Sequence, residues 1–187
     1  MNLHNISRNE RENPHKVLDE IVYRWSPRNM NGQELSEKDL LSLFEAARWA
    51  PSAFNNQPWR FYYALRDSEK FKDLLGLLVE KNRQWCLNAA CLMIVVSKKT
   101  YDHNGSPMRS HVYDTGAAWM ALAIEGIRRG YVVHGMAGFD HEAASRYLAL
   151  GDEYQINFMA VVGNPTPEVA NEAISQRKTI KEIAIPL

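Results

Sequence analysis

The alternation of apolar and polar residues divides the chain into amphipathic helical segments and short apolar runs. Helical spacing predicts helices over residues 17–24, from Ser36 to just before Pro51, over 69–85 and over 114–129, and Asp140 is placed to cap a helix through Leu148. Period-two or unbroken apolar runs predict strands at "WRFYYAL", "CLMIVVS", "YVVHGMAGF" and "INFMAVVG". This alternation, without repeats or linkers, indicates one α+β or α/β domain over residues 1–187.

The charge balance narrows the classes of partner. The chain carries 22 basic and 22 acidic residues, so nothing favours nucleic acid or an anionic membrane. No apolar run approaches the length of a bilayer span, and the polar N-terminal segment has no secretory h-region, so we expect a cytoplasmic protein. Cys86 and Cys91 lack CxxC spacing and are expected to be reduced and packed.

Motifs for acid–base, nucleophilic or metal chemistry are missing from the sequence. The six histidines show no HxxxH or HExxH spacing, so no metal site is expected. There is no GxSxG elbow, no GxGxxG after the first strand and no P-loop.

Three polar clusters remain as candidates for ligand binding. In the first, "RWSPR", Arg24, Ser26 and Arg28 occupy alternate positions, so in an extended segment all three side chains point the same way. Two guanidiniums and a hydroxyl suit a phosphate or the electron-rich edge of a heterocycle. The same residues are also consistent with a solvated basic turn.

The other two clusters are a loop and a turn. "APSAFNNQPWRF" holds Ser52 and three amide side chains between two prolines; amides donate and accept, so they match a ring edge that alternates C=O and N–H. An Asn-rich loop that bonds its own backbone is the alternative. In "HGMAGF", Gly135 and Gly138 allow backbone N–H groups close to a ligand, unless the strand end merely turns there.

Taken in order, these clusters resemble the FMN-dependent nitroreductase family. That family opens with an Arg-x-Ser-x-Arg/Lys segment, and its strongest signature is an "APSxxNxQPWxF" loop, matched here by "APSAFNNQPWRF". Asn82 before the second core strand, the Gly-Phe-Asp turn and a basic residue near the C-terminus also fit, and the resemblance runs from about Tyr23 to the end. The departures are Ala53, where Ser is frequent, and Trp25 and Pro27 as spacers of the arginine segment.

The resemblance implies an α+β fold with a central, mainly antiparallel sheet flanked by helices, in a domain-swapped homodimer that binds FMN at the subunit interface. Arg24 would stabilise the N1/O2 side of the flavin, beside Ser26, and Arg28 would share the phosphate with Arg177. The other implied cofactor-binding positions are Pro51, Ser52, Ala53 and Asn55 from the partner subunit with Gln57 in the same loop, Asn82 at the pyrimidine edge, Met136, Ala137 and Gly138 against the ring, and Lys178 near the phosphate.

In function, the resemblance implies an oxidoreductase that uses NAD(P)H to reduce nitroaromatics, quinones or related electrophiles by a ping-pong mechanism. FMN would perform the redox chemistry, which agrees with the missing acid–base motifs. Two alternatives stay open: a specialised enal, semialdehyde or dehalogenating reductase of the same fold, and a flavin-binding protein without turnover.

Overall fold

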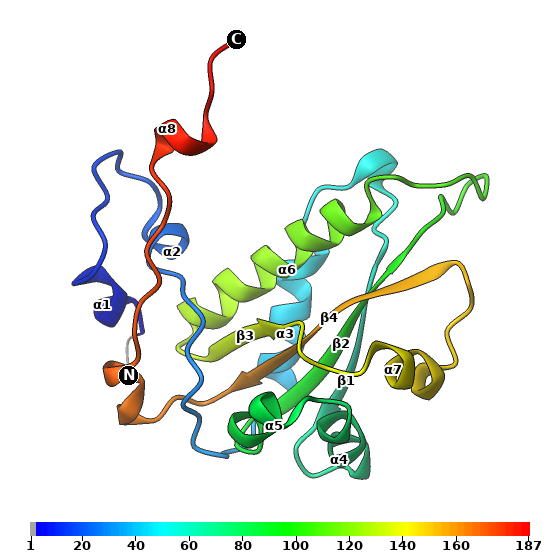
Figure 1. The fold of residues 1–187 in the computed structure, drawn as a ribbon, viewed down its shortest axis with the longest axis horizontal. Helices are drawn as coiled ribbons and strands as arrows, with labels where there is room; N and C mark the ends of the chain where they lie inside the picture. The colour runs from blue at the N-terminus through cyan, green and yellow to red at the C-terminus, as the bar shows by residue number, and fades with distance from the viewer. Residues whose placement is uncertain (1–2) are drawn as a thin grey trace.

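A four-stranded antiparallel sheet lies between layers of helices in the computed structural model, which describes residues 3–187 (Figure 1). The strands are β1 (Trp59–Leu65), β2 (Cys91–Lys98), β3 (Val132–Met136) and β4 (Tyr154–Gly163), in the order β1-β2-β4-β3. Each neighbouring pair is antiparallel. The four strands predicted from the sequence and the mainly antiparallel α+β architecture are confirmed.

The central strand β2 explains why the apolar runs are unbroken. All of its residues except the last are buried, because helices cover both faces of the sheet. Leu92, Ile94 and Val96 belong to one core, and Cys91, Met93 and Val95 belong to the other. The two sets alternate along the strand, as the pleat requires.

On one face lie α3 (Glu37–Arg48) and α6 (His111–Arg128). As predicted, Ser36 caps α3: its hydroxyl accepts a hydrogen bond from the Asp39 N–H at 3.1 Å. The helix α6 approaches β3 closely, since a Cβ added to Gly126 would lie 2.3 Å from Val133 Cγ2. A larger residue at Gly126 would therefore push the helix away from the strand that leads into the Gly-rich turn.

The opposite face carries α4 (Glu69–Gly76), α5 (Glu80–Cys86) and α7 (His141–Leu148), the last capped by Asp140 as predicted. The prediction of one helix over residues 69–85 was wrong. Leu78 forms a β-bridge with Phe139, and the Val79 N–H donates to the Gly138 carbonyl at 3.1 Å. These contacts interrupt the helix and bring α5 against the turn that follows β3.

Both ends of the chain run side by side along the β3 edge of the molecule (Figure 1). The N-terminal arm contains α1 (Leu3–Arg8) and α2 (Asp19–Val22), and the C-terminal tail contains η2 (Pro167–Asn171) and α8 (Ile180–Ile183). The helix predicted over 17–24 is a single turn, and Val17, Leu18 and Ile21 are 42, 69 and 44% exposed. Their apolar stripe does not join either core of the chain.

No helix within residues 3–187 combines the length and apolar character needed to cross a bilayer.

Candidate functional site

The segment that holds Arg24, Ser26 and Arg28 is extended and two-sided. Tyr23 and Trp25 are 7% and 4% exposed, whereas Arg24 and Ser26 are half-buried and Arg28 is exposed. The alternation expected from the sequence is therefore present. Trp25, an unusual spacer, is part of the apolar core and its indole N–H donates to the Leu3 carbonyl at 3.3 Å.

Arg24 lies in a groove of about 800 Å³ between the N-terminal arm, the C-terminal tail and α6, which we call the arginine groove. Burial lowers the pKa of Arg24, and the positive charge of Arg177 lowers it further. Within residues 3–187, none of the ion pairs involves either of these arginines. The groove is lined by Glu10, Arg11, Glu12, Val17, Ile21, Val22, Arg24, Met120, Gln176, Arg177 and Ile183.

Arg28 points to a different neighbourhood. Its guanidinium carbon lies 5.8 Å from the Trp85 ring centroid, and that ring lies 4.9 Å from the imidazole of His134. The backbone N–H of Arg28 donates to the Glu172 carboxylate at 2.9 Å, which anchors the segment to the tail. His134 Nδ1 lies 3.0 Å from the Pro27 carbonyl, which ties the segment to β3.

Asn82 and Gly138 are brought together at the turn after β3. The Asn82 amide donates to the Gly138 carbonyl at 3.0 Å. A Cβ on Gly138 would lie 2.6 Å from Asn82 Nδ2, so only glycine allows this approach. Asn82 and Trp85 both lie on α5. The residue predicted to contact the pyrimidine edge of the flavin is therefore on the same helix as the ring that contacts Arg28.

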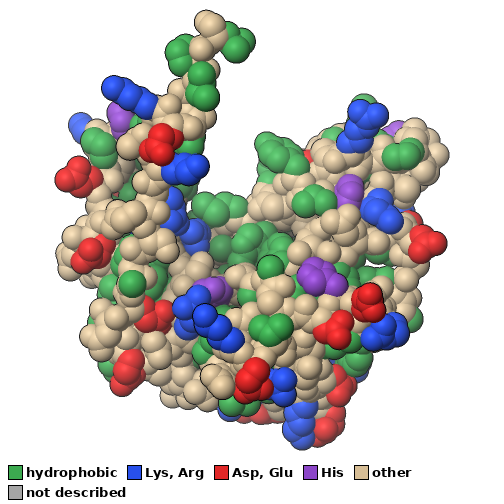
Figure 2. Space-filling view, viewed as in Figure 1, with side chains coloured by type: hydrophobic (Ala, Val, Ile, Leu, Met, Phe, Trp, Pro, Cys, Tyr) green, Lys and Arg blue, Asp and Glu red, His purple; other side chains and the backbone are tan. Residues whose placement is uncertain are grey.

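Gly135, Met136 and Ala137 form a shallow apolar hollow of about 320 Å³ with Trp119 and Phe158, which we call the β3 surface. Trp119 is followed on α6 by Met120, which lines the arginine groove, so consecutive residues of one helix contribute to the two hollows. Figure 2 shows a hollowed face with Lys and Arg side chains on one wall and hydrophobic side chains on its floor. A flat apolar ring with an anionic tail matches this combination.

The loop of residues 51–57 lies beyond the N-terminal end of α6, on the far side of that helix from the arginine groove (Figure 1). Three of its non-glycine residues have left-handed backbone: φ is 53° at Phe54, 53° at Asn55 and 48° at Gln57. Such strained backbone is concentrated at functional sites. Pro51 and Asn55 are exposed on this chain, so they are free to face another molecule.

The loop is held from inside by its own side chains and by α6. The Ser52 hydroxyl accepts from the Gln57 N–H at 2.9 Å, and the buried Asp114 carboxylate accepts from the Ala53 N–H at 2.9 Å. Asn56 joins the loop to residues 98–109, since its side chain accepts from the Asp102 N–H at 2.9 Å. Ala53 lacks the hydroxyl that a serine would offer to a ligand, but its backbone N–H is held by the Asp114 carboxylate.

Most of the predicted site residues gather in two places on this chain. Arg24 and Arg177 line the arginine groove, and Met136 and Ala137 line the β3 surface. Ser26 is bonded to Arg24, Arg28 lies over Trp85, and Asn82 is bonded to Gly138, whereas residues 51–57 form a separate group. Lys178 is exposed and is not among the residues that line the groove. The sequence reasoning missed Arg11, Trp85, Asp114 and Trp119, whose roles depend on partners far along the chain.

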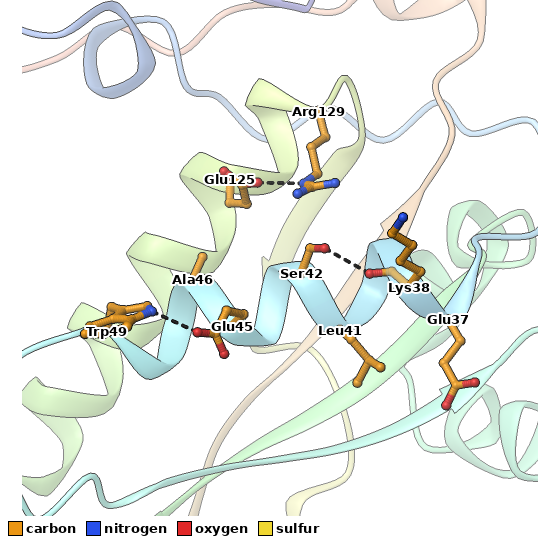
Figure 3. A pocket seen from close by; sticks show the side chains of 9 residues that line it. All are labelled: Glu37, Lys38, Leu41, Ser42, Glu45, Ala46, Trp49, Glu125 and Arg129. Atoms are coloured by element: carbon orange, nitrogen blue, oxygen red, sulfur yellow. Dashed lines mark hydrogen bonds and ion pairs between the residues drawn. The ribbon is translucent and has the colours of Figure 1, made fainter.

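A third hollow, of about 770 Å³, lies between α3 and α6 (Figure 3). Two of its carboxylates are paired with arginines: Glu45 with Arg48, and Glu125 with Arg129. Trp49 donates to Glu45 at 2.9 Å, and none of the predicted site residues lines this hollow. Within residues 3–187, no group of three or more His, Cys, Asp or Glu side chains is placed to hold a metal ion.

Comparison with known proteins defines the class of this fold. A crystal structure of an oxidoreductase containing FMN is 35% identical, with a TM-score of 0.88, and the match covers 95% of this chain and 94% of that one. A nitroreductase-type structure in complex with FMN, from a Desulfovibrio desulfuricans subspecies, has a TM-score of 0.75 at 21% identity and covers 95% of this chain and 98% of its own. The fold is the nitroreductase-like fold.

Sequence matches name the family. Residues 21–84 match the family model described as "Nitroreductase family". MhqN of Bacillus subtilis (strain 168), named provisionally as an NAD(P)H nitroreductase, is 24% identical over 185 residues, which cover 82% of this chain and 89% of that protein. The chain belongs to the nitroreductase family, a family of oxidoreductases.

Three partly buried histidines predict how stability depends on pH. Burial is the largest cause that lowers the pKa of His134, and it also lowers the pKa of His4 and His111. The folded state therefore binds these protons more weakly than the unfolded chain. The free energy of unfolding should be highest above the ordinary histidine pKa of about 6.5 and should fall as the pH drops below it.

Urea unfolding between about pH 7.5 and about pH 5.5 measures this effect. His134→Gln should flatten the dependence, and the exposed His15→Gln should leave it unchanged. An identical pH dependence in His134→Gln and the parent protein would show that His134 does not contribute.

Proposed function

We propose that the protein is an FMN-dependent oxidoreductase that uses NAD(P)H to reduce nitroaromatics, quinones or related electrophiles. One observation carries the proposal: half-buried Arg24, which takes part in none of the ion pairs within residues 3–187, lies in the arginine groove, and consecutive residues of α6 line this groove and the apolar β3 surface. A dianionic phosphate and a flat heterocycle, joined by a short chain, satisfy both parts. The FMN-containing relatives support the same cofactor.

Bound FMN would supply the redox chemistry, and the protein would bind, orient and polarise it. Within the proposal, Arg24 and Arg177 hold the phosphate, because their charges lie close enough to affect each other across the groove. The neighbourhood of Arg28, with Trp85 and the Asn82–Gly138 contact, favours the N1/O2 and pyrimidine edge for this residue. This exchanges the roles that the sequence alone suggested for Arg24 and Arg28.

The remaining groups complete the proposed pocket. Ser26 lies within 3.2 Å of the Arg24 guanidinium, which donates to its hydroxyl, and so it orients that side chain. Met136, Ala137 and Gly138 present backbone and apolar surface to the ring, and a fixed guanidinium at its N1/O2 edge stabilises negative charge that develops there. Lys178 would contribute to the phosphate only through its charge, because it lies outside the lining of the groove.

A domain-swapped homodimer is also part of the proposal. Pro51, Ser52, Ala53, Asn55 and Gln57 lie in a group apart from the arginine groove of their own chain, so they would serve the cofactor of a second copy. Ile180, Ile183, Ile185 and Leu187 in the C-terminal tail are 57% exposed or more, which suits a segment that packs on another subunit. Residues 1–187 would form one FMN-binding domain of this dimer.

A reducing, cytoplasmic location agrees with the chemistry of the two cysteines. Both thiols are free and buried, and burial raises the pKa of each to about 12. They are therefore protonated packing groups rather than redox partners of the flavin.

The first test is the visible spectrum of the purified protein. We expect flavin absorption that is bleached by anaerobic NADH or NADPH and restored by a quinone or a nitroaromatic compound. Bleaching that only enals, semialdehydes or halogenated substrates reverse would indicate a specialised reductase, and bound flavin that NAD(P)H fails to reduce would indicate a binding protein without turnover. A protein that takes up no FMN would contradict the proposal.

The second test concerns the phosphate. Arg24→Gln and Arg177→Gln should each weaken FMN binding by roughly 1.5–3 kcal/mol, because each removes a charge-assisted hydrogen bond. Riboflavin, which lacks the phosphate, should bind both variants almost as well as it binds the parent protein. Fluorescence titrations give the dissociation constants, and Lys181→Gln on α8 is the control. A double variant that purifies fully loaded with FMN would show that other residues hold the phosphate.

The third test asks whether each site is shared between two chains. Arg24→Glu and Asn55→Asp should each abolish FMN binding alone, and aspartate tolerates the left-handed backbone of Asn55. When the two variants are refolded together, random pairing should restore FMN to about a quarter of the sites, since each hybrid dimer has one intact site.

A mixture of Arg24→Glu and Arg177→Glu is the matched control, because both changes are in the same half of the site and no hybrid has an intact one. Equal FMN content in the two mixtures would rule out a shared site.

A further inference from the structure

Arg11 occupies a position that no motif of the sequence indicates. Its guanidinium lies among backbone carbonyls from two distant segments: Nη1 donates to Val22 O at 2.7 Å and to Arg24 O at 2.8 Å, and Nη2 donates to Ser175 O at 3.1 Å. The last bond spans 164 residues of sequence. One side chain of the N-terminal arm thus connects the arginine segment to the C-terminal tail.

The three carbonyls are closely related to the proposed phosphate site. One carbonyl belongs to Arg24 itself, and a second belongs to Val22, two residues before it. The third belongs to Ser175, two residues before Arg177. A guanidinium is a rigid planar fork with five N–H donors, so bonds to both segments restrict their separation and orientation. The distance between the Arg24 and Arg177 backbones is therefore set in part by Arg11.

The charges around Arg11 make this arrangement costly without an anion. Burial is the largest cause that lowers the pKa of Arg11, and the charges of Arg177 and then Arg24 lower it further. Glu10 and Glu12 line the same groove, yet within residues 3–187 none of the ion pairs joins them to these arginines. Three like charges held together, with no ion pair to a carboxylate within residues 3–187, indicate a site prepared for a multiply charged anion.

We propose that Arg11 is a positioning residue for the phosphate of the cofactor: it joins the two segments that carry Arg24 and Arg177 and so preorganises their guanidiniums. The inference rests on the proposed FMN function and extends it, because it makes the N-terminal arm part of the cofactor site. Within residues 3–187, no hydrogen bond or ion pair joins Arg11 to Asn82 or to the β3 surface, so their proposed contribution to ring binding would be independent of Arg11.

The experiment compares FMN with riboflavin on the 187-residue chain, in the assembly state in which it purifies. In Arg11→Gln, the FMN dissociation constant should rise on the order of tenfold to a hundredfold, since the amide cannot bridge both segments, while riboflavin affinity changes little. Amide hydrogen exchange should quicken at residues 175–177 in the same variant. Arg66→Gln is the matched control, because Arg66 also donates to two backbone carbonyls, those of Leu87 and Ala89, away from the groove.

Arg11→Lys separates position from charge, since the ammonium keeps the charge but lacks the fork. Continued loss of FMN preference in Arg11→Lys supports positioning, and full recovery would overturn it in favour of charge alone. Unchanged FMN affinity in Arg11→Gln, or equal loss of FMN and riboflavin, would also overturn the inference, and if Arg11→Gln does not fold, Arg11→Lys decides. A parent protein that binds riboflavin as tightly as FMN would instead contradict the proposed phosphate site itself.

Discussion

Burial of β2 on both faces is the constraint on which the rest of the architecture depends. Because seven consecutive residues of this strand are covered by helices, the centre of the sheet offers no open surface for a ligand. Hollows remain at the β3 edge of the sheet, near the N-terminal arm and the C-terminal tail. The arginine groove and the β3 surface lie at that edge, and the close packing of α6 on β3 through Gly126 fixes their relative position.

Secondary structure was predictable wherever one segment's own pattern decides it. Ser36 and Asp140 begin helices, and the four core runs are strands, because capping and burial act locally. The failures came from distant partners. The helix predicted over 69–85 breaks where the Val79 N–H donates to the Gly138 carbonyl, 59 residues further along the chain. The stripe of Val17, Leu18 and Ile21 remains exposed.

In the candidate site, too, local pattern was predictable and contacts with distant residues were not. Alternation in "RWSPR" predicted that Arg24, Ser26 and Arg28 share one side, and the buried Tyr23 and Trp25 explain why they do. The alternation of an extended segment places these three side chains on one side, but it does not predict which residues each of them contacts. Arg24 lies near Arg177, while Arg28 lies over Trp85, and both contacts depend on the path of segments that the sequence pattern leaves open.

Ala53 illustrates how a departure from a family pattern is interpreted through structure. As a side chain it offers nothing to a ligand, so the sequence marks it as the weak member of the 51–57 loop. Its N–H, however, is bonded to the buried carboxylate of Asp114, and Ser52 bonds the Gln57 N–H instead of reaching outward. The strained backbone at Phe54, Asn55 and Gln57 is therefore maintained from within. In the proposed dimer the loop would present its shape, the exposed Asn55 and the exposed Pro51 to the second chain, and a hydroxyl at position 53 is not required to hold that shape.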